Sequence, residues 1–575
     1  MRSKPITIFQ ANVGHTRPAH LIALQLAFEH NFDLVCIQEP WISREYHRKF
    51  TCSHPGYDTH VALDSWDKDN RPRAATYARK GAGLQTEQLR PLGQQGDLMV
   101  TVSNGITVYN TYNANDRHNA ASLLLCQQAP KQKTVILGDF NMHHRRWEPQ
   151  LTGPSTNGAN SFIKWLDSGP LTLLSNPGDS THNLGHTLDL AFATPDLLIW
   201  GASAMIEKSL HSTSDHCTLT ISIPLREKQR VHGAGKLMTG LIEEPAFRER
   251  LRSYPLPPCT SLATKEELDE EAITITEAIS KTAASLAPRK RDSARGSPWW
   301  SEECSMAMLD RGTPEGAKHA QQVVAKAKRS YYSQVIANAS TAKEAFTIAG
   351  WHKLTGRFST IPLKGGDGYL AVTTEDKARL LRRKVLTEAA CACDIQPEDS
   401  TPGTGHLPFP PLEEPEIRRA LLDAGNTTPG DDEISVPLLK MAWPILSERI
   451  GALYKACLAL GHHPRPFRNA DVVFIPKTGK RDQSLPKSYR PISLLRTLGK
   501  GLERLVAKRL SWVAIKYKVL HPQQFGALPL RSSADLTACL VHDVEEAWAK
   551  DRKLISSVLT ADIKGPSMQS SLNVC

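Results

Sequence analysis

Polar side chains follow several short apolar runs in the first 225 residues, each at the point where a β-strand would end. Strand ends on one edge of a packed sheet converge, so these groups can share one pocket. Carboxylates, amides, a phenol and an imidazole are suited to holding a divalent cation and moving protons. The groups that follow such runs are Asn12, Glu39, Tyr112, Asn113, Asp139 and Asn141, whereas Asp189 lies within the run HTLDLAF and Asp215 and His216 precede the run TLTISI. Together they indicate a site for metal-assisted acid–base chemistry.

Each of these elements also has a purely structural explanation. The turn that holds Asp139 and Asn141 could be a helix N-cap, because both side chains accept hydrogen bonds from free backbone donors. Glu39 before Pro40 could be a solvated turn residue, and Asp215 could cap or pair locally. Any one of them alone is more often structural. The structural explanation does not account well for the presence of all of these residues in this order.

The elements that must position these groups are short strands separated by polar loops. One amphipathic helix is expected over 19–30. The pattern predicts an α/β or α+β fold in which sheets carry the core. The predicted strands cover 6–9, 34–37, 106–109, 135–137 and 219–223.

After Pro224 the sequence becomes mainly helical, with long predicted helices over 265–287 and 317–339. A segment rich in Pro, Gly and Thr over 396–411 is typical of a linker. A region rich in Lys and Arg follows. We therefore predict three parts, namely 1–225, a mainly helical connector over 226–410, and 411–575.

The composition narrows the class of protein. A chain of 575 residues is too long for one hydrophobic core. The net charge of +11 suits a polyanionic partner but does not identify one. Eleven scattered cysteines without paired C-x-x-C motifs favour a reducing compartment. With neither a signal sequence nor a membrane-length apolar run, the expectation is an intracellular protein, nuclear or cytoplasmic, with no membrane partner.

The order and spacing of the polar motifs resemble the endonuclease/exonuclease/phosphatase superfamily. They resemble most closely the endonuclease domain of LINE-type (non-long-terminal-repeat) retrotransposon polyproteins. The motifs stand here as QANVGH, CIQEP, YNTYNAN, LGDFNMHH, HTLDLAF and TSDH, and they span roughly 5–224. The resemblance implies two packed β-sheets flanked by helices and a DNA substrate. An asparagine, Asn113, and the two residues after it replace a proline often found after the tyrosine.

The resemblance also implies a role for each group. Mg²⁺, for which Mn²⁺ can substitute, suits Glu39 as a direct ligand and Asn12 and Asp215 as direct or water-mediated ligands. Asp139 would take the proton of the attacking water, and Asn141 would orient that water or donate to the phosphate. The remaining donors to the phosphate would be Tyr112 and a charged His216 held by Asp189 next to Thr187.

Two histidines just beyond the candidate catalytic turn, His143 and His144, could contact DNA phosphate. A solvated helix face explains them equally well.

Within the basic region 465–518, the run over 472–510 resembles the fingers of a reverse transcriptase, in which Lys477 and Arg490 would bind the template, RNA in the parent family. Asp562 resembles the first metal-binding Asp of the palm. The continuation to Cys575 does not resemble a second carboxylate pair, so the sequence predicts a truncated, inactive polymerase and, upstream of it, a DNA endonuclease. The alternatives are a phosphatase or phosphodiesterase of the same superfamily acting on another substrate, and a non-catalytic nucleic-acid-binding remnant. No feature of the sequence indicates the oligomeric state or the DNA sequence that would be cut.

Overall fold

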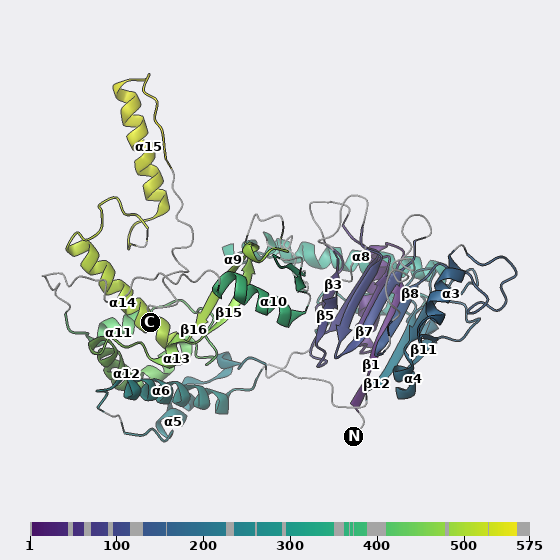
Figure 1. The fold of residues 1–575 in the computed structure, drawn as a ribbon, viewed down its shortest axis with the longest axis horizontal. Helices are drawn as coiled ribbons and strands as arrows, with labels where there is room; N and C mark the ends of the chain where they lie inside the picture. The colour runs from purple at the N-terminus through teal and green to yellow at the C-terminus, as the bar shows by residue number, and fades with distance from the viewer. Residues whose placement is uncertain are drawn as a thin grey trace. The chain divides into compact units, whose positions relative to one another are not determined.

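The computed structural model contains two compact units, one formed by Met1–Ala234 with Arg291–Ala378 and the other by Gly235–Lys290 with Arg379–Cys575 (Figure 1). The predicted connector 226–410 thus contributes residues to both units, and the three-part division stays a prediction. The structure describes residues 3–43, 50–62, 71–89, 96–114, 130, 132–156, 158–225, 235–258, 261–289, 295–349, 362–366, 369–371, 373–387, 410–477, 482, 484–526 and 528–559.

Within its described residues, the first unit contains two six-stranded sheets. The first sheet has the order β11 (Ser203–Ile206), β12 (Leu219–Leu225), β1 (Ser3–Asn12), β2 (Leu34–Gln38), β4 (Ala74–Arg79) and β3 (Tyr57–Val61). The second has the order β5 (Thr86–Leu89), β6 (Leu98–Ser103), β7 (Ile106–Tyr112), β8 (Thr134–Asp139), β10 (Asp189–Ala193) and β9 (Thr172–Leu173). The pairs β1–β2 and β7–β8 are parallel, whereas β8–β10 is antiparallel. This α/β architecture confirms the predicted fold class.

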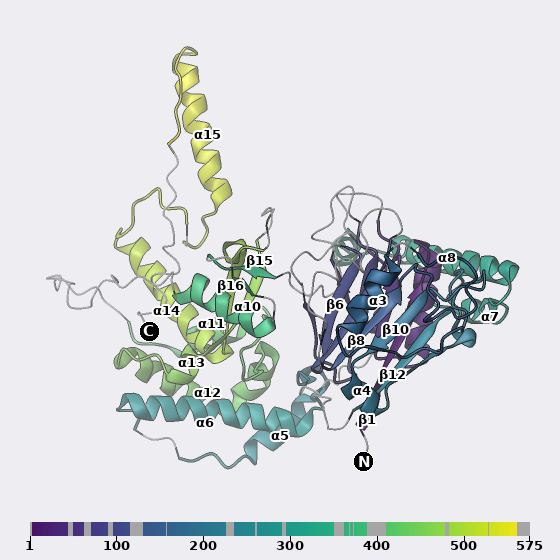
Figure 2. The same ribbon diagram turned by 45° about the vertical axis from the view of Figure 1, so that its right-hand side comes forward.

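The two sheets pack against each other, and the central strands bury their opposite faces in different cores. In β1, Ile6 and Ile8 face the second sheet, whereas Phe9 and Ala11 face the helices, because successive side chains of a strand alternate. The helices α1 (Arg17–Glu29), α7 (Glu302–Ala307) and α8 (Pro314–Ala337) cover the outer side of the first sheet. The helix α3 (Ala159–Asp167) covers the second sheet (Figure 2).

The five strands predicted from the sequence are confirmed as parts of β1, β2, β7, β8 and β12. The helix predicted over 19–30 is confirmed as α1, which begins two residues earlier with Pro18 in its first turn. The helix predicted over 317–339 is confirmed as α8. It packs Ala320 and Val324 against the core that contains α1, which the sequence did not reveal.

A glycine in β8 allows the two central strands of the second sheet to approach closely. Gly138 has a φ of +147°, and a Cβ atom added to it would lie 1.8 Å from the backbone oxygen of Thr111 in β7. That oxygen belongs to the backbone of the strand paired with β8, so it cannot shift without disturbing the pairing. The next residue is Asp139, so this contact fixes the strand end that carries a candidate site residue.

We therefore expect Gly138→Ala to destabilise the first unit by at least ~3 kcal/mol, the sum of backbone strain and overpacking. The midpoint of urea unfolding measures this. The matched control is Gly153→Ala, where the added Cβ has no atom within 4 Å and the expected change is within ~0.5 kcal/mol. Equal midpoints for the two variants would contradict the close approach.

The second unit is mainly helical around one core that includes Leu268, Ile275, Leu439, Tyr454 and Leu502. The N-terminus of α6 is fixed by a capping box between Thr264 and Glu267, confirming the helix predicted over 265–287. Its helices and hairpin are α5 (Glu244–Arg252), α6 (Lys265–Leu286), α11 (Glu414–Leu422), α12 (Val436–Ala459), α13 (Arg465–Arg468), β15 (Ala470–Pro476), β16 (Tyr489–Leu495), α14 (Thr497–Lys516) and α15 (Ser533–Lys550). The shorter elements of the chain are α4 (Pro195–Trp200), α9 (Ala342–Ala349), β13 (Leu363–Lys364), β14 (Leu370–Ala371) and α10 (Thr374–Leu381).

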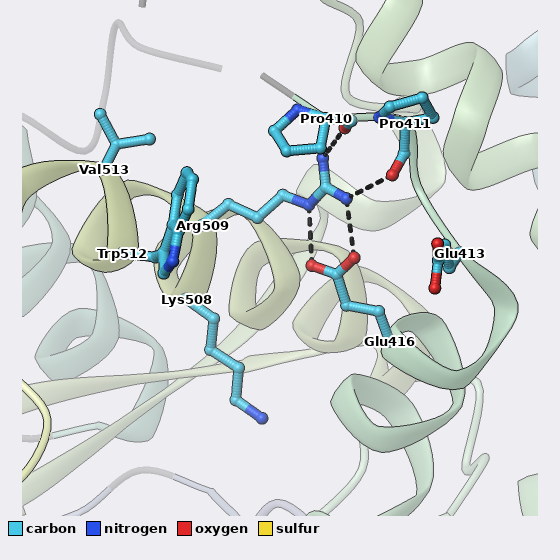
Figure 3. A pocket seen from close by; sticks show the side chains of 8 residues that line it. All are labelled: Pro410, Pro411, Glu413, Glu416, Lys508, Arg509, Trp512 and Val513. Carbon is cyan, nitrogen blue, oxygen red and sulfur yellow. Dashed lines mark hydrogen bonds and ion pairs between the residues drawn. The ribbon is translucent and has the colours of Figure 1, made fainter. Parts of the chain in front are cut away.

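A buried arginine of α14 holds the start of α11. The Arg509 guanidinium donates to both carboxylate oxygens of Glu416, at 2.7 Å each, and to the carbonyl oxygens of Pro410 and Pro411 (Figure 3). The same helix uses Lys500 to donate to the carbonyl of Thr428 at 2.8 Å. These two cationic side chains of the basic region therefore hold elements of the second unit together.

The described cysteines Cys36, Cys52, Cys217, Cys304, Cys457 and Cys539 are all free thiols. Among the helices that the structure describes, none combines the length and apolar character needed to cross a bilayer.

Candidate active site

The inner faces of the two sheets change from apolar to polar at one end of the sandwich. Along β1 the side chains that face the second sheet run from Ile6 and Ile8 to Gln10 and Asn12, and along β8 they run from Leu137 to Asp139. This end is where the parallel strands β1, β2, β7 and β8 finish. The polar residues gathered there are Gln10, Asn12, Gln38, Asn110, Asp139 and Asp189.

Side-chain hydrogen bonds join the two sheets at this polar end. The pairs are Asn12 Nδ2 to Asp139 Oδ2 at 2.9 Å, Gln10 Nε2 to Asp189 Oδ1 at 3.3 Å, and Gln38 Nε2 to Asn110 Oδ1 at 2.6 Å. Such pairing is required because a buried polar group without a partner costs about 1–3 kcal/mol. Sequence reasoning missed Gln10, Gln38 and Asn110. Counting every second residue back from Asn12 would have found the first of them.

Asp139 lies at the centre of this polar end and is almost fully buried. Its Oδ1 accepts the backbone N–H of Asn141 at 3.0 Å, and the Asn141 amide donates to the carbonyl of Asn113 at 3.0 Å. Asn141 has a φ of +48°, a strained conformation that persists where the surroundings hold it. Burial and the charge of Asp189 raise the pKa of the Asp139 carboxyl well above its usual value, which suits a proton acceptor.

His216 bridges the two carboxylates. Its Nδ1 lies 2.8 Å from Asp189 Oδ2, and its Nε2 lies 3.9 Å from Asp139 Oδ2. Burial alone would lower the pKa of His216, but the Asp189 carboxylate, with Asp139, raises it above its usual value. The side chain of Thr181 fixes Asp189 by accepting its backbone N–H at 2.9 Å. The imidazole is therefore held in one orientation and favours its charged, donating form.

Glu39 follows β2 in a left-handed conformation with a φ of +48°. Its Oε1 lies 3.1 Å from His15 Nε2, and the Tyr112 hydroxyl also donates to this carboxylate. Burial opposes ionisation, but these donors and the charges of His15 and Arg73 lower the pKa of Glu39 below its usual value. Burial and the Glu39 charge raise the pKa of Tyr112, so its hydroxyl stays a donor.

Asp215 is half-exposed, and its Oδ2 lies 3.4 Å from His182 Nε2. The neighbouring Ser214 hydroxyl donates to the carbonyl of Asn12 at 2.6 Å and so ties this loop to the end of β1. The rings of His182 and His216 lie 4.8 Å apart. His182 was missed by sequence reasoning, since a single histidine in a polar loop carries no signal by itself.

The other predicted residues lie elsewhere. His143 and His144 stand in an irregular segment after β8 and not on a helix, so the solvated helix face is wrong; their contact with DNA stays a prediction. The Thr187 hydroxyl donates to the carbonyl of Asp179 at 2.9 Å. Lys477 and Arg490 belong to the β15–β16 hairpin of the second unit. Asp562 lies outside the described residues.

The oxygen ligands at this end of the sandwich suit a hard divalent cation. Carboxylate and amide oxygens of Glu39, Asp215 and Asn12 are the ligand types that Mg²⁺ takes. The buried acceptors Gln10 Oε1 and Gln38 Oε1 have no hydrogen-bond partner in the described part of the chain, so polar capacity at this end remains unused. The arrangement combines a buried base, a cationic donor and oxygen ligands, which are the groups that metal-assisted hydrolysis of an anionic ester needs.

Comparison with known proteins identifies the relatives of this chain. Residues 106–220 match the family model described as "Endonuclease-reverse transcriptase". The chain is 26% identical over 462 residues to the "Probable RNA-directed DNA polymerase from transposon BS" of Drosophila melanogaster, covering 72% of this chain and 49% of that protein. It is 34% identical over 140 residues to the "Retrovirus-related Pol polyprotein from type-1 retrotransposable element R1" of Bradysia coprophila, covering 24% of this chain and 14% of that protein.

A solved structure, "Endonuclease domain of TRAS1, a telomere-specific non-LTR retrotransposon", is 21% identical, with a TM-score of 0.32, and covers 39% of this chain and 100% of that one. The chain spans about half or less of the length of the curated relatives named above. The matched segment 106–220 contains Tyr112, Asp139, Asn141, Asp189 and His216. Residues 106–220 therefore match the endonuclease–reverse transcriptase family, and the chain is similar to proteins of non-long-terminal-repeat (LINE-type) retrotransposons.

Proposed function

We propose that the first unit is a Mg²⁺-dependent endonuclease, with Mn²⁺ able to substitute, that nicks DNA by hydrolysing a phosphodiester bond. The observation that carries the proposal is the buried chain of groups in which Asp189 holds His216 at 2.8 Å and His216 Nε2 lies 3.9 Å from Asp139. The family of the chain supports nucleic acid as the substrate. Such a protein would act inside the cell, in the nucleus or the cytoplasm.

In the proposed reaction Asp139 accepts the proton of the attacking water. Asn141 orients that water, because its amide is held beside the Asp139 carboxylate at 3.3 Å. His216 donates to a non-bridging phosphate oxygen and stabilises the charge that grows there. Tyr112 would turn its single hydroxyl donor from Glu39 to the phosphate and act there as a second donor. Mg²⁺, held by Glu39 with Asn12 and Asp215, supplies positive charge to the phosphate when bound.

The metal assignment is tested by Glu39→Gln, which removes a charged ligand and keeps the shape of the side chain. We expect the Mg²⁺ concentration for half-maximal nicking to rise at least ~10-fold, as loss of a group that supports a metal site does. Titration of Mg²⁺ in a plasmid-nicking assay measures the change. The control is Glu29→Gln, at the exposed end of α1. An unchanged Mg²⁺ requirement in Glu39→Gln would remove Glu39 from the metal site.

We also propose that the β15–β16 hairpin contacts the phosphate backbone of a nucleic acid, with RNA as the template in the parent family. Ile475 pairs with Arg490 across the hairpin, and Lys477 comes just after β15, so both cations lie at the same end. Arg490 is exposed, whereas the Lys477 ammonium donates to the carbonyl of Lys487 at 2.9 Å.

Replacing both cations, in Lys477→Gln/Arg490→Gln, should reduce the salt dependence of RNA binding. Each lost phosphate contact lowers the slope of log K against log salt by about 0.7–0.9, so the double variant should lose roughly 1–2. Fluorescence anisotropy with single-stranded RNA at several salt concentrations measures the slope. The charge-matched control is Arg252→Gln/Lys265→Gln, in which both replaced residues are exposed. Equal slopes in the two double variants would show that Lys477 and Arg490 are exposed to solvent and do not contact the nucleic acid.

A further inference from the structure

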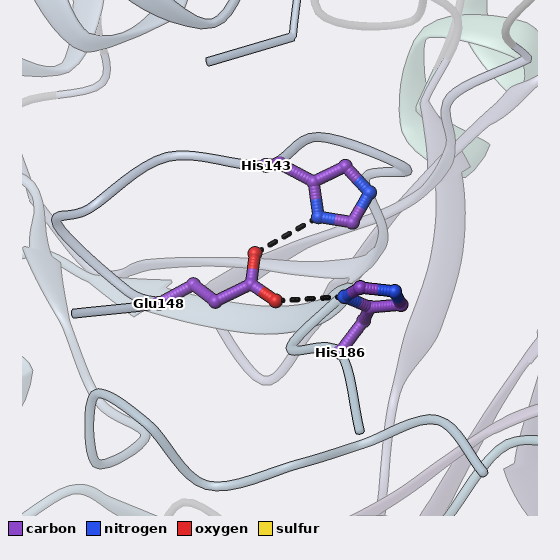
Figure 4. A group of neighbouring side chains, drawn as sticks. All are labelled: His143, Glu148 and His186. Atoms are coloured by element: carbon purple, nitrogen blue, oxygen red, sulfur yellow. Dashed lines mark hydrogen bonds and ion pairs between the residues drawn. The ribbon is translucent and has the colours of Figure 1, made fainter. Parts of the chain in front are cut away.

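A second cluster of ligand-type side chains lies beside the candidate active site and has no role in the proposed reaction. It consists of His143, Glu148 and His186, and we call it the His143–Glu148–His186 cluster (Figure 4). His143 follows β8 two residues after Asn141. His186 precedes β10 three residues before Asp189.

Both imidazoles of the cluster point at one carboxylate. His143 Nδ1 lies 2.8 Å from Glu148 Oε2, and His186 Nδ1 lies 2.9 Å from Glu148 Oε1. The two rings lie 4.6 Å apart at an angle of 71°. Figure 4 shows that each histidine approaches a different oxygen of the Glu148 carboxylate, and the ligand atoms of the three residues all lie within 4.8 Å of one another.

Burial and charge distinguish this cluster from an ordinary surface ion pair. The Glu148 side chain is 3% exposed, whereas the two histidines are 33% and 42% exposed. Within the described ranges, the Glu148 carboxylate has no lysine or arginine partner. A buried carboxylate without a fixed cation normally requires a compensating charge. Here one face of the cluster is open to solvent, so a cation can enter.

From this geometry we propose that the His143–Glu148–His186 cluster binds one Zn²⁺ ion. Two imidazole nitrogens and one carboxylate are a ligand set that zinc takes, with the fourth position left to water. Ligand atoms around tetrahedral zinc lie about 3.3 Å apart, given Zn–N distances of ~2.0–2.1 Å. The observed separations of 2.8 and 2.9 Å need to open by only ~0.5 Å. Asp and Asn oxygens do not contribute, which separates this site from the proposed Mg²⁺ site.

Zinc bound by this cluster would link two chain segments that carry candidate catalytic groups. The segment after β8 brings Asn141, and the segment before β10 brings Asp189. Their backbones already meet where the Phe140 N–H donates to the carbonyl of Leu188 at 2.9 Å. His143 and His186 would thus be positioning residues. The binding of zinc itself does not depend on the proposed nuclease function.

A competing site must be distinguished in the test. His182, Asp215 and His216 form another group with metal-ligand spacing, and they belong to the candidate active site. Zinc held there would be lost on replacing His182 and kept on replacing His186. The phosphate contact considered above for His143 predicts weaker DNA binding without any loss of zinc.

The experiment uses the 575-residue chain in excess Mg²⁺, first stripped of transition metals and then titrated with Zn²⁺ or with Co²⁺ as a visible-absorbing probe. Bound metal is measured by elemental analysis after dialysis. The wild type should retain one tightly held zinc. His143→Gln and His186→Gln should each weaken it at least ~10-fold, while His144→Gln and His182→Gln retain it. Near-UV circular dichroism of the metal-free variants checks their folding.

No tight zinc in the wild type would overturn the proposal. So would zinc that survives in both His143→Gln and His186→Gln, or that is lost in His182→Gln alone. Loss of DNA binding in His143→Gln with zinc unchanged would assign this residue to phosphate instead.

Discussion

Asp139→Asn is expected to lower the rate of DNA nicking at saturating Mg²⁺ by at least ~100-fold, the usual cost of losing a positioned base. The amide cannot accept the proton of the attacking water, yet it has the size of the carboxylate and can keep a hydrogen bond to Asn12. The fold should therefore persist, which makes the loss a chemical one. Single-turnover conversion of supercoiled plasmid measures the rate.

The matched control for this variant is Asp167→Asn, in which a surface carboxylate paired with Arg146 is neutralised. Its nicking rate should stay within about two-fold of the wild type, because surface pairs contribute little. Wild-type activity in Asp139→Asn would remove this residue from the reaction. Loss of nicking activity in both variants would indicate that the substitutions disturb folding.

His216→Gln should also lower the nicking rate by at least ~100-fold, the typical cost of losing a donor to the developing charge. The reason is that glutamine cannot carry the positive charge that Asp189 stabilises at 2.8 Å. Asp189→Asn should be slow for the same reason. Because the two residues act as one unit, the double variant should be little slower than the worse single variant.

Additive losses in the double variant would mean that Asp189 acts independently of His216. The control for the histidine change is His30→Gln, at the exposed end of α1. Rates are compared under single-turnover conditions, so that product release does not hide a slow chemical step.

An alternation with a period of two is visible in the sequences of β1, β7 and β12, and these strands were predicted. Sequence reasoning missed β4, whose residues AATYAR are almost all buried on both faces and so show no alternation. It also missed β3 (YDTHV) and β5 (TEQL), which contain few apolar residues, although each pairs with the next strand along the chain. The fold class was legible because it needs only the type of the elements and not their pairing.

The sequence revealed the candidate site residues at the ends of strands, but not the polar residues that lie earlier in the same strands. Asn12, Asp139 and Asp189 come together as expected, whereas Gln10 and Asn110, which hold the sheets together, look like ordinary strand residues in the sequence. The assignment of roles to the predicted residues stays a prediction. The placement of α8 against α1 depends on Ala320 and Val324, whose small side chains give no signal of a long-range contact.

The most direct measurement is nicking of supercoiled plasmid by the 575-residue chain with Mg²⁺, with EDTA, and with Asp139→Asn in place of the wild type. Open-circular product is expected only from the wild type with Mg²⁺, with more turnover of DNA than of an inositol phosphate offered at the same concentration. Nicking that persists in EDTA, or equally fast nicking by Asp139→Asn, would contradict the proposed metal-dependent endonuclease. Faster turnover of the inositol phosphate would assign the site to a phosphatase instead.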